Sequence, residues 1–214
     1  MKQMIIKVLS LVLITICVSM QPKMRKNKIS VTTIDLVDIH KINPNIILDI
    51  RYATKNNFTK KKIYPCAKCY LRKKVVLKLD KIQKELEKKD LGLKIWDGYR
   101  RLSDQQTFWD LVPDKRYVQD PAKGSKHNRG CAVDLTLVDK HGKELLMPTE
   151  FDNFTEKAHA NYMELPALAI AHRQLLKDIM VKYGFIPART EWWHFEDTEW
   201  EMYEILDIAI DALG

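Results

Sequence analysis

Hydrophobic positions follow a helical period in three parts of the 214-residue chain. Apolar side chains at 75, 76, 79, 82 and 86 predict a helix over 75–91, with Gly92 as its stop. A second helix is expected over 165–183. Ser103, followed three residues later by a glutamine, forms a capping-box pattern and predicts a third helix that ends before Pro113.

Other stretches follow the two-residue period of strands. Short strands are expected within 34–50, over 93–99 and in the run that Asp134 opens. A turn at 140–143 is expected to close a hairpin onto 144–147. Strands are also predicted at 185–187 and 192–195, a long ordered loop at 148–163, and a helix or short strand in the tail over 201–213.

The N-terminus resembles an export leader. Lys2 and Lys7 precede an apolar run over 8–18, which is the length of a signal-peptide core and short for a membrane span. Cleavage after Ser19, lipidation at Cys17 and an uncleaved anchor all remain open, and all three export the rest of the chain. We therefore predict a leader at 1–19, a linker at 20–33, one domain at 34–214, and a periplasmic or envelope location. A membrane contact is expected only through the leader.

Composition narrows the class of protein. Hydrophobic residues make up 46% of the chain, which favours a globular domain, and the formal net charge is +8. A basic chain can bind nucleic acid. The lysines are, however, spread along the sequence without a basic helix or a nucleic-acid motif, so no nucleic-acid partner is expected.

Two constellations carry candidate chemistry. His127 and Asp134 lie seven residues apart with Gly130 between them, and Glu191 precedes His194 by three residues. A catalytic zinc takes three ligands from His, Asp or Glu and leaves one position open, and a nearby carboxylate can move the proton. A loop histidine and a strand-end aspartate are also common without a metal, but the second constellation favours a zinc hydrolase.

The cysteines are open to several interpretations. Cys66 and Cys69 have the spacing of half a zinc site or a redox pair, but no second pair exists to complete a four-cysteine site. A surface loop with a strained disulfide or two free thiols is the simpler interpretation. Cys131 is expected to be a small buried residue beside the strand.

The motifs together resemble one family of enzymes. Ser125-x-His127-x-x-Gly130-x-Ala-x-Asp134, followed by Glu191-Trp-Trp-His194-Phe, is similar to the zinc D-alanyl-D-alanine dipeptidases, which include vancomycin-resistance enzymes. The blocks Tyr52-Ala-Thr-x-Asn-Asn-Phe-Thr59 and Trp96-Asp-Gly-Tyr-Arg100 also resemble this family, so the similarity runs from about residue 34 to the C-terminus.

The resemblance implies roles for single residues. It implies one zinc per chain held by His127, Asp134 and His194, with Glu191 as the general base. It implies that Arg100 stabilises the oxyanion; Arg101 would point to the opposite face of a strand. By the same resemblance Asp152 holds the substrate's ammonium group, and Ser125 is a candidate for hydrogen bonding to the substrate. A loop carboxylate and a loop-capping hydroxyl are the alternatives for these two.

The resemblance also implies the fold and the reaction. We expect a single α+β domain with a central antiparallel sheet flanked by helices, of the Hedgehog/D-Ala-D-Ala peptidase type. The expected reaction is hydrolysis of the small dipeptide D-alanyl-D-alanine in cell-wall peptide turnover. The alternatives are a D,D- or L,D-carboxypeptidase or endopeptidase on longer peptidoglycan stems, and a zinc-bearing wall-binding module without catalysis. The leader departs from the cytoplasmic resistance enzymes.

Overall fold

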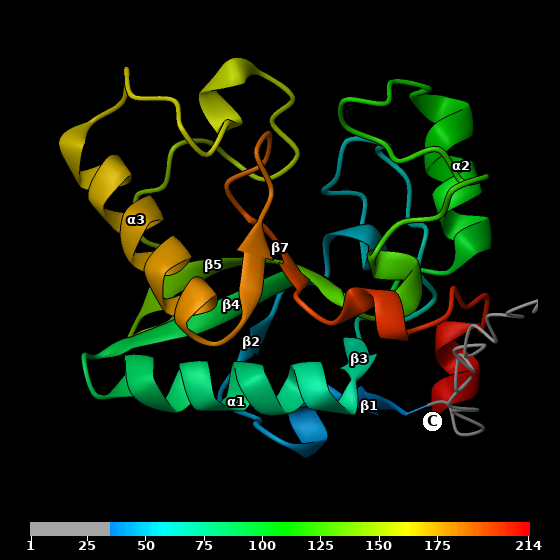
Figure 1. Ribbon diagram of the computed structural model, residues 1–214, viewed down its shortest axis with the longest axis horizontal. Helices are drawn as coiled ribbons and strands as arrows, with labels where there is room; N and C mark the ends of the chain where they lie inside the picture. Colours follow the sequence, from blue (N-terminus) through cyan, green and yellow to red (C-terminus); the bar gives the residue numbers. More distant parts are fainter. Residues whose placement is uncertain (1–34) are drawn as a thin grey trace, which may run out of the picture. The chain divides into compact units, whose positions relative to one another are not determined.

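A five-stranded sheet forms the centre of the domain, with strand order β2-β4-β5-β7-β6 (Figure 1). The computed structural model describes residues 35–214. The strands of this sheet are β2 (Ile47–Leu48), β4 (Leu91–Asp97), β5 (Ala132–Asp139), β6 (Phe185–Pro187) and β7 (His194–Asp197). The pair β2–β4 is parallel and the other three pairs are antiparallel. The predicted antiparallel sheet is therefore correct except at this one edge.

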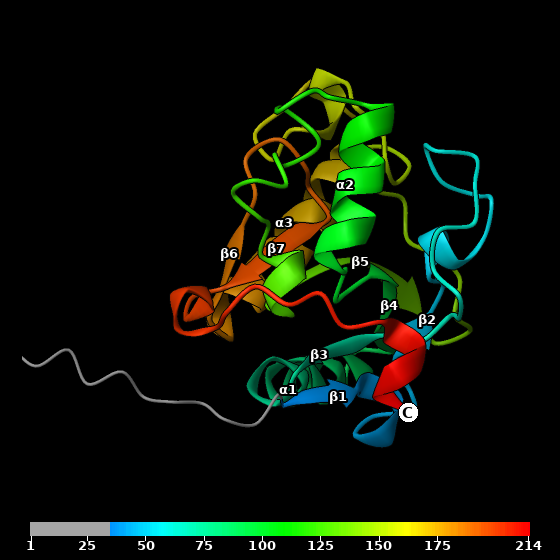
Figure 2. The same ribbon diagram turned by 90° about the vertical axis from the view of Figure 1, so that its right-hand side faces the viewer.

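Three helices and a second, two-stranded sheet accompany the central sheet. The helices are α1 (Lys73–Glu87), α2 (Leu102–Leu111) and α3 (Ala167–Lys182), and the small sheet pairs β1 (Leu36–Asp38) with β3 (Tyr70–Arg72). Short 3₁₀ helices lie at Ile39–Lys41, Arg51–Ala53, His127–Arg129, Glu156–Ala158, Trp200–Met202 and Ile210–Leu213. In both ribbon views α1 and the small sheet lie on one side of the central sheet, and α2 rises on the other side (Figures 1 and 2).

Hydrophobic burial explains how these elements pack. The apolar face of α1, which includes Val76 and Leu79, is fully buried together with Leu93 of β4 and Leu135 of β5. Every residue of β5 except its last is buried, so this strand is covered on both faces. Burial of this kind makes β5 a rigid support for any side chain that it carries.

Two predicted helix boundaries were wrong. The first helix ends at Glu87 rather than beside Gly92, because a turn with Asp90 at φ 56° reverses the chain and Gly92 already belongs to β4. The helix predicted to begin at Ser103 begins one residue earlier, without a side-chain cap. The Ser103 hydroxyl instead donates to Asp207 (Oγ–Oδ1 2.8 Å), because the C-terminal segment docks on this end of α2.

The tail over 201–213 was also predicted wrongly, since it forms only two 3₁₀ helices. Between them the chain runs beside the loop that carries His127, and the Leu206 amide donates to the Asn128 carbonyl (2.8 Å). The predicted hairpin at 144–147 shrinks to one bridge between Val138 and Glu144. Of residues 35–214, no helix is long and apolar enough to span a membrane. The leader and the linker lie outside the described residues, and those predictions stay predictions.

Candidate active site

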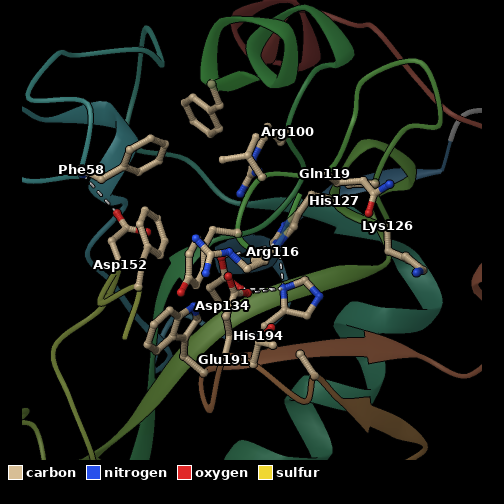
Figure 3. A pocket seen from close by; sticks show the side chains of 18 of the residues that line it. Phe58, Arg100, Arg116, Gln119, Lys126, His127, Asp134, Asp152, Glu191 and His194 are labelled. Carbon is tan, nitrogen blue, oxygen red and sulfur yellow. Dashed lines mark hydrogen bonds and ion pairs between the residues drawn. The ribbon is translucent and has the colours of Figure 1, made fainter. Parts of the chain in front are cut away.

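Two neighbouring strands and one loop bring three potential metal ligands together. Asp134 on β5 and His194 on β7 are register partners across the antiparallel pair, with His194 Nδ1 3.0 Å from Asp134 Oδ1. His127 Nε2 lies 3.2 Å from His194 Nδ1 and 3.5 Å from Asp134 Oδ2. Figure 3 shows the three side chains converging on one point. In residues 35–214 this is the one group of three His, Cys, Asp or Glu side chains with metal-binding spacing.

The spacing of these atoms fits a tetrahedral metal ion. Zinc–nitrogen and zinc–oxygen bonds of about 2.0–2.1 Å place ligand atoms about 3.3 Å apart on the edges of a tetrahedron. The two histidine nitrogens are 3.2 Å apart, and each lies near one oxygen of Asp134, His194 Nδ1 at 3.0 Å from Oδ1 and His127 Nε2 at 3.5 Å from Oδ2, so these separations are close to that value. Two imidazoles and one carboxylate are also the ligand types that zinc takes in hydrolases. The residues present could therefore hold a zinc ion and leave its fourth position free.

Local structure orients His127. Gly130 follows its 3₁₀ turn at φ 70°, the left-handed region that favours glycine, and this turn directs the chain into β5. A Cβ atom there would lie 2.6 Å from Leu36 Cδ2. The Nδ1 atom of His127 donates to the Gly98 carbonyl (2.7 Å), which leaves Nε2 free to face the other two ligands.

The electrostatics of the group favour a bound cation. Burial raises the pKa of Asp134, but the charge and hydrogen bond of His127 and the hydrogen bond of His194 lower it further and hold it well below its usual range. Burial lowers the pKa of His194, yet hydrogen bonds with Asp134 and Glu196 raise it to about 10. The carboxylates around His194 thus stabilise positive charge at this point, whether a proton or a metal ion carries it.

Glu191 lies beside the ligand group on the turn that precedes β7. Its Oε2 atom is 4.0 Å from His194 Nδ1, and its side chain lines the cleft. Burial raises the pKa of Glu191 to about 7; His194 lowers it, and Asp134 and Asp152 raise it. A carboxylate whose pKa lies near neutrality can both accept and release a proton in one catalytic cycle.

Asp97 fixes Arg100 at the cleft. Arg100 Nε and Nη2 donate to Asp97 Oδ2 (3.1 and 2.6 Å), and Nη1 donates to Gln105 Oε1 (2.9 Å). Asp97 is fully buried, accepts a further hydrogen bond from Tyr64, and lies 3.7 Å from His127 Nδ1. One carboxylate therefore supports both the guanidinium and a metal ligand.

Arg101 occupies a different environment. It pairs with Asp104 on the outside of α2 (Nη2–Oδ1 2.7 Å), and it does not line the cleft. Of the two adjacent arginines Arg100 lines the cleft and Arg101 does not. The strand alternation used to predict this does not apply, because β4 ends at Asp97 and Arg101 directly precedes α2.

We expect Arg100→Lys to lower kcat for the reaction proposed below by about 100- to 1,000-fold, because a lysine retains the charge but loses the planar donors that face the cleft. Zinc content should stay at the wild-type level, since Arg100 is no ligand. The matched control is Arg101→Lys, which should retain wild-type turnover. Loss of zinc in the Arg100 variant would show instead that this arginine supports the metal site.

Asp152 lies across the ligand group from Lys126 (Figure 3). Tyr52 Oη donates to Asp152 Oδ1 (3.0 Å), and the Phe58 amide donates to Oδ2 (3.3 Å). Burial raises the pKa of Asp152 to about 7, although the Tyr52 hydrogen bond acts in the opposite direction. The cleft thus carries an acidic group at one end and a basic group at the other.

The surroundings of Ser125 are compatible with a substrate contact and with a loop-capping hydroxyl, and both stay predictions. Ser125 lines the cleft, and its hydroxyl accepts a hydrogen bond from the Asn128 amide (3.4 Å) within its own loop. Asn128 in turn anchors the loop to the arginine segment through a hydrogen bond to the Arg100 carbonyl (2.9 Å).

Aromatic contacts enclose the cleft, which has a volume of about 260 Å³. Phe154 stacks on Tyr117 (ring centroids 4.6 Å apart) and contacts Phe58 edge-on (5.4 Å). These three rings come from three loops that lie far apart in the sequence. Ligand pockets commonly span about 300–1,000 Å³, so this cleft suits a small ligand.

Comparisons with known proteins agree with the geometry of the candidate active site. A family model described as D-ala-D-ala dipeptidase matches residues 32–207. The chain belongs to the D-ala-D-ala dipeptidase family. A D-alanyl-D-alanine dipeptidase of Escherichia coli (strain K12) is 40% identical over 174 residues, covering 81% of this chain and 90% of that protein. One from Enterococcus faecalis (strain ATCC 700802 / V583) is 31% identical over 169 residues, covering 69% and 84%.

Among solved structures, the LD-carboxypeptidase LdcB is similar with a TM-score of 0.45 and 22% identity, over 78% of this chain and 69% of that one. The family model and the two dipeptidases confirm the predicted membership of the D-ala-D-ala dipeptidase family.

Several residues at this D-ala-D-ala dipeptidase cleft were missed as functional from the sequence. The sequence predicted no contact with the cleft for Tyr52 and Phe58, although their block resembles the family. It indicated Asp97 only as part of the block that ends in Arg100. Glu196 follows His194 by two residues on a strand, a spacing that places both side chains on one face and could have indicated it. The other histidines of the described residues lie outside the ligand group.

The three cysteines of residues 35–214 do not line the cleft. Cys66 and Cys69 are free thiols, and Cys131 is a fully buried one, as predicted for a small residue beside β5. Burial raises the pKa of Cys131 to about 12, so this thiol stays protonated at neutral pH.

Proposed function

We propose that this protein is a zinc-dependent D-alanyl-D-alanine dipeptidase that releases two D-alanine molecules, with one zinc per chain on His127, Asp134 and His194. The observation that supports it best is the close spacing of these three ligands, whose ligand atoms all lie within 4.8 Å of one another, with Glu191 beside them. Zinc at this position supplies Lewis acidity, which activates water and polarises the peptide carbonyl. The family match supports the reaction class.

The chain's own residues account for the proton and charge movements. Glu191 accepts a proton from the attacking water and passes it to the leaving amine as the peptide C–N bond breaks. Arg100, held in place by Asp97, lies where it can stabilise the negative charge that develops on the carbonyl oxygen. Since this charge is absent from the bound substrate, the guanidinium favours the transition state over the ground state.

The two ends of the cleft complement a zwitterionic dipeptide. The partly buried carboxylate of Asp152 suits the free ammonium group, and Lys126 at the other end suits the free carboxylate (Figure 3). Ser125, which directly precedes Lys126 in the chain, also lines the cleft. A longer peptidoglycan stem would place a neutral amide against Asp152 and its preceding residues against the Phe58–Phe154–Tyr117 contacts. We therefore favour the dipeptide over longer stems as the substrate.

The function is tested by measuring D-alanine release from D-Ala-D-Ala and from a pentapeptide ending in D-Ala-D-Ala, each with and without a chelator. The proposal expects chelator-sensitive release from the dipeptide alone. Release from the pentapeptide would assign a carboxypeptidase. A zinc-loaded protein that is silent on both would overturn the dipeptidase function.

The pH dependence of KM provides a test of Asp152. Below a pKa of about 7 this carboxyl is protonated and cannot attract an ammonium group; above it the carboxylate is ionised. The substrate's ammonium stays charged up to a pKa of about 8. KM for D-Ala-D-Ala should therefore fall as the pH rises from about 6 to 7.5. Asp152→Asn should raise KM and remove this dependence, whereas a wild-type pH profile in the variant would exclude Asp152 from ammonium binding.

Export of the domain across a membrane is proposed separately, from the leader alone. A reporter that is active only after export, fused to the C-terminus of the full chain, should become active. The dipeptide would then derive from wall material outside the cytoplasm.

A further inference from the structure

The two nitrogen atoms of the His194 ring have different surroundings. Nδ1 faces the ligand group, 3.0 Å from Asp134 Oδ1 and 3.2 Å from His127 Nε2. Nε2 points away from that group and lies 3.3 Å from Glu196 Oε1. Since no carboxylate oxygen of Glu196 belongs to the ligand group, this glutamate contacts the metal site only through the histidine.

The carboxylate of Glu196 is paired with Lys126. Glu196 lies on β7 two residues after His194, and its side chain is 21% exposed. Lys126 Nζ lies 3.3 Å from Glu196 Oε1, and the same ammonium group lies over the Trp200 ring, 4.8 Å from its centroid. Lys126 directly precedes His127, so the chain that supplies one ligand also supplies the partner of Glu196.

We propose that Glu196 is a positioning residue that accepts a hydrogen bond from His194 Nε2 and so directs Nδ1 at the metal, with Lys126 holding the Glu196 carboxylate in place. This inference rests on the proposed zinc site. A histidine ligand needs its second nitrogen bonded to fix both the tautomer and the ring orientation. His127 meets that need with the Gly98 carbonyl at 2.7 Å, and Glu196 is the acceptor within reach of His194 Nε2.

As the hydrogen-bond acceptor of a histidine ligand, a charged carboxylate strengthens metal binding more than a neutral carbonyl group does. Its negative charge increases the electron density that the imidazole donates, which strengthens a metal–nitrogen bond. Replacing Glu196 should thus weaken zinc binding even where the fold stays intact, because His194 is left free to rotate and donates less strongly.

The test measures zinc affinity of the full chain by competition with a chromophoric chelator. Glu196→Ala should raise the zinc dissociation constant by about 10- to 100-fold, the usual effect of losing such a partner. The matched control is Glu199→Ala, which removes a glutamate three residues further along that pairs with Lys74 and does not line the cleft. The control should bind zinc as the wild type does.

Two conservative variants separate positioning from a general effect on folding. Glu196→Gln retains an oxygen acceptor, so its zinc dissociation constant should lie between those of the wild type and of Glu196→Ala. Lys126→Met should raise the dissociation constant by less than Glu196→Ala does, because the carboxylate remains. In the cobalt-substituted protein at saturating metal, Glu196→Ala should shift the visible absorption bands, since the His194 ring no longer has a fixed orientation.

An unchanged dissociation constant and an unchanged cobalt spectrum in Glu196→Ala would overturn the proposal. Equal weakening in Glu199→Ala would overturn it as well, because the effect would then come from any change in this part of the chain rather than from the contact with His194. Metal affinity is measured without substrate, so this result stands apart from dipeptide hydrolysis. A protein that fails on D-Ala-D-Ala but loses zinc affinity in Glu196→Ala would retain the positioning role and lose the proposed activity.

Discussion

Glu191→Gln should lower kcat for D-Ala-D-Ala by about 100- to 10,000-fold, the range attributed to a positioned general base. The amide has nearly the same shape as the carboxyl group but cannot accept the proton of the attacking water. Zinc content should remain at the wild-type level, because Glu191 lies 4.0 Å from His194 Nδ1 and outside the ligand group. Turnover is measured as D-alanine release and zinc by atomic absorption.

The control for this variant is Glu201→Gln, which makes the same substitution at an exposed glutamate in the tail. It should retain full activity. If Glu191→Gln turned over the dipeptide at the wild-type rate, the general base would have to be another group of the cleft. Asp152 would be the next candidate, as a partly buried carboxyl with a pKa of about 7.

His194→Ala should lose both zinc and turnover. Zinc sites bind with about 10–16 kcal/mol, so each of four coordinating positions contributes about 2.5–4 kcal/mol, or about 70- to 1,000-fold in affinity. A protein prepared by desalting should therefore contain little zinc. The measurement is zinc content together with D-alanine release, with and without added zinc.

His141→Ala serves as the matched control, since His141 is exposed in the turn after β5 and belongs to no ligand group. It should retain zinc and activity. Full zinc content in His194→Ala would remove His194 from the ligand set. The effect on turnover would then need another explanation.

The sequence predicted the elements along which apolar residues recur at a regular spacing. Asp134 was placed on a strand because apolar and polar residues alternate after it, and β5 begins two residues before it. The helix predicted over 165–183 appears as α3, since a long amphipathic period seldom permits another structure. Strands β6 and β7 were also paired as expected.

Other parts depended on tertiary contacts that no local pattern contains. The capping box at Ser103 gave way to Asp207, a residue more than a hundred positions further along the chain. Apolar residues of the tail have helical spacing, but the Leu206 amide donates its hydrogen bond to the loop that carries His127 rather than within a helix. At the site, the sequence indicated the three residues that the structure brings together as the ligand group, and Glu191 and Arg100 beside the cleft. The supporting contacts of Asp97, Lys126 and Glu196 became visible only once the strands and loops were placed.

The register pairing of Asp134 with His194 has a consequence for mechanical integrity. These residues are 60 positions apart in the sequence yet face each other across one pair of strands. A metal ion bridging them would act as a crosslink that closes a long chain loop, and such closures add most where the loop is long. The β6–β7 hairpin, which pairs with β5 over three residues only, would be the part that this crosslink fastens. Stripping the metal should thus expose the hairpin to proteases before the rest of the sheet loosens.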